Sequence, residues 1–157
     1  EFGKKIKYII EGGLSKIGLE STIINLTGRP EILRVGTIDI NKLSKALKKK
    51  LFYRKKTYMK VPGQNKLHYS PGIPLRMNCK EASLDEAFIL VKKRNNSNKN
   101  FFYLSKNKNL KEAARNLYSV LRMIKKKGYK KIAVEKIQNK GIGLAINDRL
   151  QKASSKK

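Results

Sequence analysis

The chain has 157 residues, the length of one domain or of two small ones joined by a linker. Apolar residues make up 39% of it, which argues against global disorder, and no run approaches the roughly 20 apolar residues of a membrane helix. The net charge of +27 is compatible with weak RNA binding, but 30 of the 38 basic residues are Lys, and genome composition rich in AT codons could also produce this charge.

Short strands are predicted at the start of the chain. They cover residues 6–10, 20–26 and 31–35, where many apolar residues are β-branched and where turns containing Gly or Pro separate the runs. The sequence has no initiating Met and enters the first strand at once. We therefore expect it to be a fragment of a longer protein.

A short helix is predicted next. Asp39 or Asn41 can cap its N-terminus, and the run Lys48-Lys49-Lys50 at its end is favourable beside the negative end of the helix dipole. The apolar positions that share one face of this helix are Ile40, Leu43, Ala46 and Leu47.

Residues 50–78 have the composition of a linker. They contain three of the four prolines and many basic residues, and they show no sustained periodicity. Structureless segments of this length are usually functional or lie between domains. We therefore expect three parts, with a first unit at residues 1–49, a linker or lid at 50–82, and a second unit at 83–157.

The second unit is predicted to be a small Rossmann-like α/β domain. Its clearest helix begins at Asn109, where Glu112 has the spacing of a capping box. Strands are expected at residues 88–91, 101–104 and 131–135, and a last helix at residues 144–153. This alternation of strands and helices predicts a parallel sheet covered by helices.

Three residues far apart in the chain are candidates for ligand contacts. Ser21 could hydrogen-bond an amino acid, and the guanidinium of Arg34 has a geometry suited to phosphate. Tyr69, with its neighbour His68, could lie on a nucleotide if the linker closes as a lid. Each also has an ordinary explanation, because strand hydroxyls, strand-end arginines and linker histidines are common at surfaces.

The remaining candidates are weaker. Gly141-Ile142-Gly143 before a helix could cradle phosphate, but a tight turn is the favoured explanation. Cys79 has no partner for an internal disulfide, which favours an inert thiol in a reducing cytoplasm. The sequence shows no zinc-ligand spacing and no nucleophile–base pair, so we expect no metal site and identify no catalytic residue.

Taken in order, five segments resemble the YrdC-type L-threonylcarbamoyl-AMP (threonylcarbamoyladenylate) synthases, in the long form with an extra C-terminal domain. They are Glu11-Gly12-Gly13, Gly18-Leu19-Glu20-Ser21-Thr22-Ile23-Ile24, Ile32-Leu33-Arg34-Val35-Gly36, Pro62-Gly63 followed by His68-Tyr69-Ser70-Pro71, and Gly141-Ile142-Gly143-Leu144-Ala145-Ile146-Asn147-Asp148-Arg149-Leu150. The resemblance implies that residues 1–49 are the C-terminal portion of a twisted YrdC-like α/β sheet domain.

The resemblance also implies a function. Such enzymes use L-threonine, bicarbonate and ATP to form threonylcarbamoyl-AMP and pyrophosphate, for the threonylcarbamoyladenosine modification of tRNA by a downstream transferase. Ser21 would hold L-threonine, Arg34 and Tyr69 would contact ATP, and His68 would belong to the lid. ATP, with or without Mg²⁺, would be a substrate, and no tightly bound cofactor is expected.

The chain departs from the family pattern in several places. The Lys-x-Arg and Ser-x-Asn elements of the first half of the synthase domain are missing, and Val35 stands where the family usually has Pro. We therefore expect the 157-residue chain alone to be inactive. The alternative is a non-catalytic remnant that binds RNA electrostatically.

Overall fold

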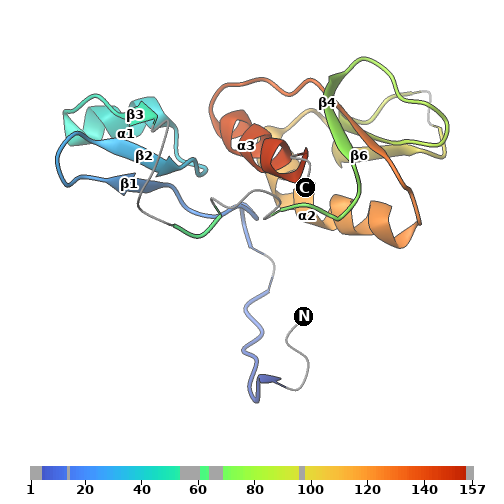
Figure 1. The fold of residues 1–157 in the computed structure, drawn as a ribbon, viewed down its shortest axis with the longest axis horizontal. Helices are drawn as coiled ribbons and strands as arrows, with labels where there is room; N and C mark the ends of the chain where they lie inside the picture. The colour runs from blue at the N-terminus through green and yellow to red at the C-terminus, as the bar shows by residue number, and fades with distance from the viewer. Residues whose placement is uncertain (1–4, 14, 54–60, 64–68, 96–97, 155–157) are drawn as a thin grey trace.

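The computed structural model describes residues 5–13, 15–53, 61–63, 69–95 and 98–154. The elements form two α/β parts that are well separated in Figure 1. The first part contains β1 (Ile23–Asn25), β2 (Glu31–Arg34), α1 (Ile40–Leu47) and β3 (Phe52–Tyr53). The second contains β4 (Leu75–Cys79), β5 (Ala87–Lys92), β6 (Phe101–Ser105), α2 (Leu110–Lys126), β7 (Ile132–Glu135) and α3 (Ile142–Ser154). The predicted α/β class is confirmed.

The first part is a small three-stranded sheet with one helix. β2 lies in the middle, antiparallel to β1 and parallel to β3. Asp39 is the N-cap of α1, because its Oδ1 accepts hydrogen bonds from the backbone N–H groups of Asn41 at 2.9 Å and Lys42 at 3.3 Å. Of the two predicted caps, Asp39 is therefore the one used.

The second part is built on a four-stranded sheet in the order β4-β7-β5-β6, in which every neighbouring pair is parallel. Both of its helices pack on one face of this sheet, where Leu117 of α2 and Ile146 of α3 join Ile89 and Leu104 in a single buried cluster. This confirms the parallel sheet predicted from the strand–helix order.

The opposite face of this sheet is covered differently from the expectation. Phe88 and Leu90 are buried there beneath partly buried side chains that include Phe101 and Tyr103. The Phe88 and Phe101 rings meet edge to face with their centroids 5.8 Å apart. Within the described chain, aromatic side chains rather than a helix close this face, so the unit is thinner than a three-layer Rossmann fold.

The start of α2 confirms half of the predicted capping box. Asn109 Oδ1 accepts hydrogen bonds from the N–H groups of Lys111 at 2.9 Å and Glu112 at 3.2 Å. The Glu112 carboxylate does not return to the Asn109 N–H but accepts a hydrogen bond from Ser105 Oγ at 2.7 Å. The same Ser105 hydroxyl accepts the Asn109 N–H at 2.8 Å, so it replaces Glu112 in the box.

The predicted strand at residues 6–10 was wrong. Residues 6–10 form no strand, and Ile10 is 96% exposed, because no described strand pairs with this segment. The range 50–82, expected to be a linker or lid, contains β3, which pairs with β2, and β4, which forms an edge of the second sheet. His68 lies outside the described residues. Among the helices of the described chain, none has the length and apolarity needed to cross a membrane.

A candidate ligand site between the two parts

Arg34 and Ser21 lie in direct contact. Arg34 is only 9% exposed at the end of β2, and its Nη2 donates to Ser21 Oγ at 3.1 Å while its Nε donates to the Ser21 carbonyl oxygen at 2.9 Å. The Arg34 Nη1 donates to the Pro62 carbonyl oxygen at 3.1 Å. Arg34 is therefore a buried residue that joins the approach to β1 to the segment after β3, and not the solvated arginine that a strand end usually carries.

Tyr69 approaches Arg34 at Gly63, the residue after Pro62. Gly63 is buried with a φ of +86°, and a Cβ added to it would overlap the Tyr69 hydroxyl and stand 3.4 Å from Arg34 Cδ. Glycine is needed there both for its backbone conformation and for this close approach. The structure thus brings together Ser21, Arg34 and Tyr69, the three candidates proposed from the sequence.

The second part of the molecule adds one aromatic ring and one arginine to this cluster. Tyr69 stacks on Tyr118 of α2, with ring centroids 5.7 Å apart. The carboxylate of Glu20 lies 3.3 Å from the Tyr118 hydroxyl, and it accepts a hydrogen bond from Nε of Arg149 in α3 at 3.0 Å. The segment that carries Ser21 is therefore fixed to both helices of the second part.

Charge and burial set the protonation of this cluster. Burial acts to raise the pKa of Glu20, but a hydrogen bond from its own backbone and the ion pair with Arg149 outweigh it, so the pKa lies below its usual value. Burial raises the pKa of Tyr69 and of Tyr118. At neutral pH the cluster therefore holds a carboxylate beside phenols that keep their protons.

The backbone between the candidates is packed too closely for side chains. A Cβ on Gly36, two residues after Arg34, would overlap the backbone of Ser21 and Thr22. The Thr22 hydroxyl is buried and has no hydrogen-bond partner among the residues described. The absence of a side chain at Gly36 therefore allows the segment after β2 to lie against Ser21 and Thr22, which precede β1.

Glu20, Tyr118 and Arg149 were not among the candidates chosen from the sequence. One signal for Arg149 was available, because it shares a helix face with Ile146, Leu150 and Ala153, all of which are buried. An arginine inside an apolar stripe indicates a buried charge with a partner elsewhere in the fold. Its partner Glu20, 129 residues earlier, cannot be found from periodicity.

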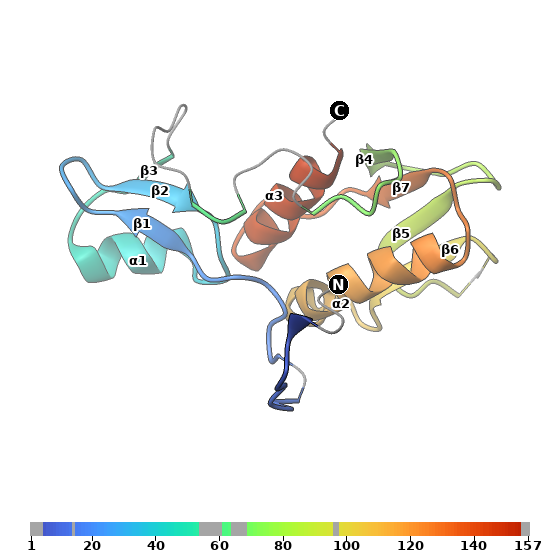
Figure 2. The same ribbon diagram turned by 60° about the horizontal axis from the view of Figure 1, so that its bottom comes forward.

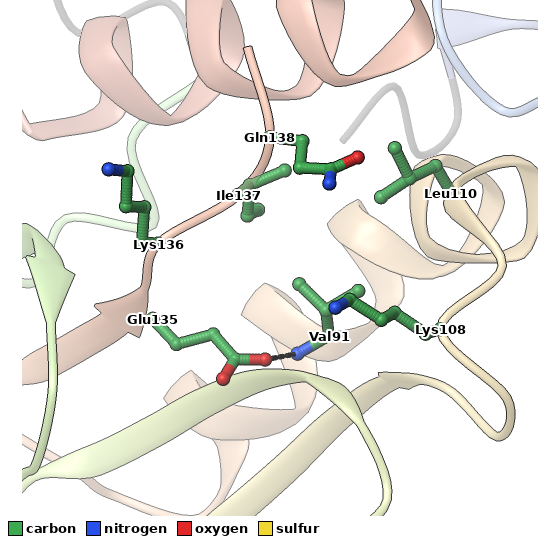
Figure 3. Close-up of a pocket in the computed structure, with 7 residues that line it drawn as sticks. All are labelled: Val91, Lys108, Leu110, Glu135, Lys136, Ile137 and Gln138. Atoms are coloured by element: carbon green, nitrogen blue, oxygen red, sulfur yellow. Dashed lines mark hydrogen bonds between the residues drawn. The ribbon is translucent and has the colours of Figure 1, made fainter. Parts of the chain in front are cut away.

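A separate cavity of about 420 Å³ lies at the carboxyl ends of β5 and β7, where open parallel sheets often bind ligands. Figure 3 shows Glu135 in this cavity, bonded to the backbone N–H of Val91. Its other carboxylate oxygen lies 3.3 Å from Arg94. The first N–H groups of the neighbouring helix α2 are already capped by Asn109. The carboxylate in this cavity and the first N–H groups of α2 are thus engaged within the protein.

The weaker candidates have structural explanations. A Cβ on Gly143 would overlap the Gln138 carbonyl oxygen, which supports a tight turn before α3. Cys79 is buried, and its Sγ lies 3.6 Å from the Arg76 carbonyl oxygen. The described residues contain no group of three or more His, Cys, Asp or Glu side chains that could hold a metal ion.

Comparison with known proteins identifies the family. The family described as "Threonylcarbamoyl-AMP synthase, C-terminal domain" matches residues 31–155, which is most of the chain. The chain belongs to this family. It therefore shares a domain type with the threonylcarbamoyl-AMP synthases, as the resemblance of its motifs implied.

Two curated threonylcarbamoyl-AMP synthases are similar to the chain over almost its full length. The protein from Pyrococcus abyssi is 29% identical over 177 residues, which cover 98% of this chain and 51% of the relative. The protein from Schizosaccharomyces pombe is 30% identical over 186 residues, which cover 96% of this chain and 46% of the relative. The chain spans about half the length of the curated relatives it matches.

Two solved structures of P. abyssi Sua5 have the same fold. The crystal structure of the complex with L-threonine superposes with a TM-score of 0.81 at 28% identity, over 98% of this chain and 51% of that one. A variant in which a His and the following Tyr are both replaced by Ala superposes with a TM-score of 0.71 at 25% identity, over 91% and 47%. The fold of the chain therefore matches that of about half of P. abyssi Sua5.

Proposed function

We propose that this chain supplies part of the L-threonine and ATP site of a threonylcarbamoyl-AMP synthase, which makes the activated intermediate for threonylcarbamoyladenosine in tRNA. The observation that carries the proposal is the hydrogen bond between Arg34 and Ser21, together with the position of Tyr69 next to Gly63, which also lies close to Arg34. These residues come from three segments and meet where the two parts of the molecule join. Their gathering at one place supports a shared role in ligand binding.

The reaction requires two steps. The threonine amine attacks bicarbonate and forms the carbamate with loss of water. A carbamate oxygen then attacks the α-phosphorus of ATP, the bond to the β-phosphate breaks, and pyrophosphate leaves with its electron pair. Neither step needs a covalent protein nucleophile, so the protein contributes positioning and charge stabilisation.

The geometry suits each residue to a different role. The Ser21 hydroxyl accepts from Arg34 and can still donate its own proton to a carboxylate of L-threonine. Arg34 directs Nε, Nη1 and Nη2 to protein oxygens, yet a guanidinium has five N–H donors, so donors remain for a phosphate oxygen. Burial raises the pKa of Tyr69, so its phenol keeps its proton at neutral pH and adds no negative charge beside the phosphates of a nucleotide.

The relatives add support. The P. abyssi protein is named a threonylcarbamoyl-AMP synthase and was crystallised with L-threonine. A variant of that protein alters adjacent His and Tyr residues, and the only histidine of this chain, His68, also precedes a tyrosine, Tyr69. We propose that this His–Tyr pair serves the nucleotide side of the site.

Binding of L-threonine tests the proposal directly. L-threonine titrated into ¹⁵N-labelled protein is expected to shift the amide resonances of Ser21, Thr22, Gly36 and Tyr69, and D-threonine is expected to leave them in place. Ser21→Ala should abolish the shifts, whereas Ser119→Ala, on the exposed side of α2, should not. Shifts confined to residues far from Ser21, or equal shifts with both enantiomers, would contradict the proposal.

Catalysis is a second and independent readout. Because the chain spans about half the length of its curated relatives, the 157-residue chain alone is expected to release no pyrophosphate from ATP in the presence of L-threonine and bicarbonate. Pyrophosphate release that depends on both L-threonine and bicarbonate would show that the pocket is complete in this chain.

A further inference from the structure

We infer that Arg149 is a positioning residue through which the second part of the molecule sets the geometry of the proposed substrate site. The inference rests on the proposed function for the identity of the site, but the contacts that carry it are independent of any ligand. One guanidinium on α3 contacts the three segments that hold the three candidate ligand residues.

Each contact lies next to a candidate. Arg149 Nε donates to Oε2 of Glu20, the residue before Ser21, at 3.0 Å. Its Nη1 donates to the carbonyl oxygen of Val35, the residue after Arg34, at 2.7 Å. Its Cζ lies 5.2 Å from the ring centroid of Tyr69 itself, within the range of a cation–π interaction. These partners come from the approach to β1, the end of β2 and the segment before β4.

The burial of Arg149 argues against a purely stabilising role. Its side chain is 0% exposed, and a second carboxylate, Asp148, lies 2.6 Å from Nη1. Removing a guanidinium and its carboxylates from water is so costly that an apolar side chain of similar volume often gives equal or greater stability. The Nη2 of Arg149 is also buried with no hydrogen-bond partner among the described residues. An arginine at this position is therefore explained by the geometry it imposes.

The same burial keeps Arg149 out of contact with substrate. A side chain without accessible surface in this arrangement does not touch substrate, so its influence passes through Glu20, Val35 and Tyr69. The replacement of the family's Pro by Val35 preserves this contact, because Arg149 binds the backbone carbonyl oxygen and any residue supplies one. Lys at position 149 would keep the charge but could not reach three segments with one planar group.

The test compares Arg149→Met, which keeps most of the volume, with Arg149→Lys and with Arg122→Met on the exposed side of α2 as the matched control. The Kd for L-threonine is expected to rise at least tenfold in Arg149→Met and to recover only partly in Arg149→Lys. Hydrogen exchange of the Ser21, Thr22 and Gly36 amides should become faster, while the amides of β5 and β6 keep their protection. Arg122→Met should match the unchanged protein in both measurements.

The two measurements separate this inference from the proposed function. If the unchanged protein binds no L-threonine, the proposed function fails, and the exchange rates alone decide whether Arg149 positions these segments. A threonine Kd within twofold of the unchanged protein, or exchange at Ser21 and Gly36 that Arg149→Met does not alter, overturns the inference. If Arg149→Met does not fold, Glu20→Gln removes the same ion pair from the other side and is judged by the same two criteria.

Discussion

The hydroxyl of Tyr69 lies against the backbone of Gly63, so closely that no side chain fits between them. Gly63 also faces Arg34 Cδ, and the residue before it, Pro62, accepts a hydrogen bond from Arg34 Nη1 at 3.1 Å. Pro62 and Gly63, which follow β3, therefore contact both candidate ATP residues. The position of Tyr69 relative to Arg34 therefore requires a residue without a side chain at position 63.

Gly63→Ala is expected to displace Tyr69 and weaken ligand binding. The added Cβ meets the Tyr69 hydroxyl, and the φ of +86° costs an L-residue about 1–2 kcal/mol in addition. Gly72→Ala is the matched control, because Gly72 has a similar φ of +77° but only Lys125 Nζ, at 3.8 Å, near the added atom. Urea denaturation and L-threonine titration should show a larger loss of stability and affinity for Gly63→Ala. Equal losses would mean that the Tyr69 contact has no effect.

Gly36→Ala should destabilise the first part of the molecule by about 1–3 kcal/mol, the usual cost of overpacking. Its Cβ would overlap backbone atoms of Ser21 and Thr22, which cannot move aside as a flexible side-chain tip could. Gly12→Ala, with nothing within 4 Å of its Cβ, should change the free energy of unfolding by less than about 0.5 kcal/mol. Similar unfolding midpoints for the two variants would rule out this packing.

Glu86 is expected to make stability fall in acid. Hydrogen bonds from Arg76 at 2.7 and 2.9 Å hold the pKa of this carboxyl at about 2, against a usual value of 4.5. The unfolded chain therefore takes up the proton first, and the stability present above pH 4.5 is lost as the pH falls towards 2. Glu86→Gln should flatten the dependence of the unfolding free energy on pH in this window.

Asp85→Asn provides the control for that measurement. The Asp85 side chain is 65% exposed in its ion pair with Lys131. Asp85→Asn should therefore leave the pH dependence of the unfolding free energy as it is in the unchanged protein. If Glu86→Gln and the unchanged protein lose stability equally between pH 4.5 and 2, the Arg76 contact is not maintained in solution.

Leu117→Ala should remove about 2–5 kcal/mol of stability, because Leu117 is fully buried where α2 packs on the second sheet. Met123→Ala, on the same helix but 48% exposed, should cost less than about 1 kcal/mol. Chemical denaturation of both variants measures the difference. Comparable losses would show that α2 does not pack on this sheet as described.

Elements that are defined by local patterns were predictable from the sequence. The apolar stripe and the Asn109 cap determine α2, and the buried run of β5 identifies the interior of a parallel sheet. Residues 6–10 misled the prediction because a strand depends on a partner, and their β-branched composition says nothing about whether one is present. β4 was missed since its burial alternates within a segment rich in basic residues and prolines.

The site was predictable only in part, for a related reason. Ser21, Arg34 and Tyr69 belong to segments that resemble a known family, so each could be selected without knowledge of the fold. Glu20 and Arg149 form an ion pair across 129 residues, and neither periodicity nor spacing carries information about such a contact. Figure 2 shows how the fold creates it, with the chain before β1 running towards α2 and α3.

The place of Arg149 in the last helix has a consequence for biosynthesis. The ribosome synthesises Glu20, Val35 and Tyr69 well before α3. In a nascent chain these three segments therefore lack the arginine that joins them until α3 has been made. Translation that stops before Arg149 would leave a polypeptide able to form its early strands yet unable to assemble the junction.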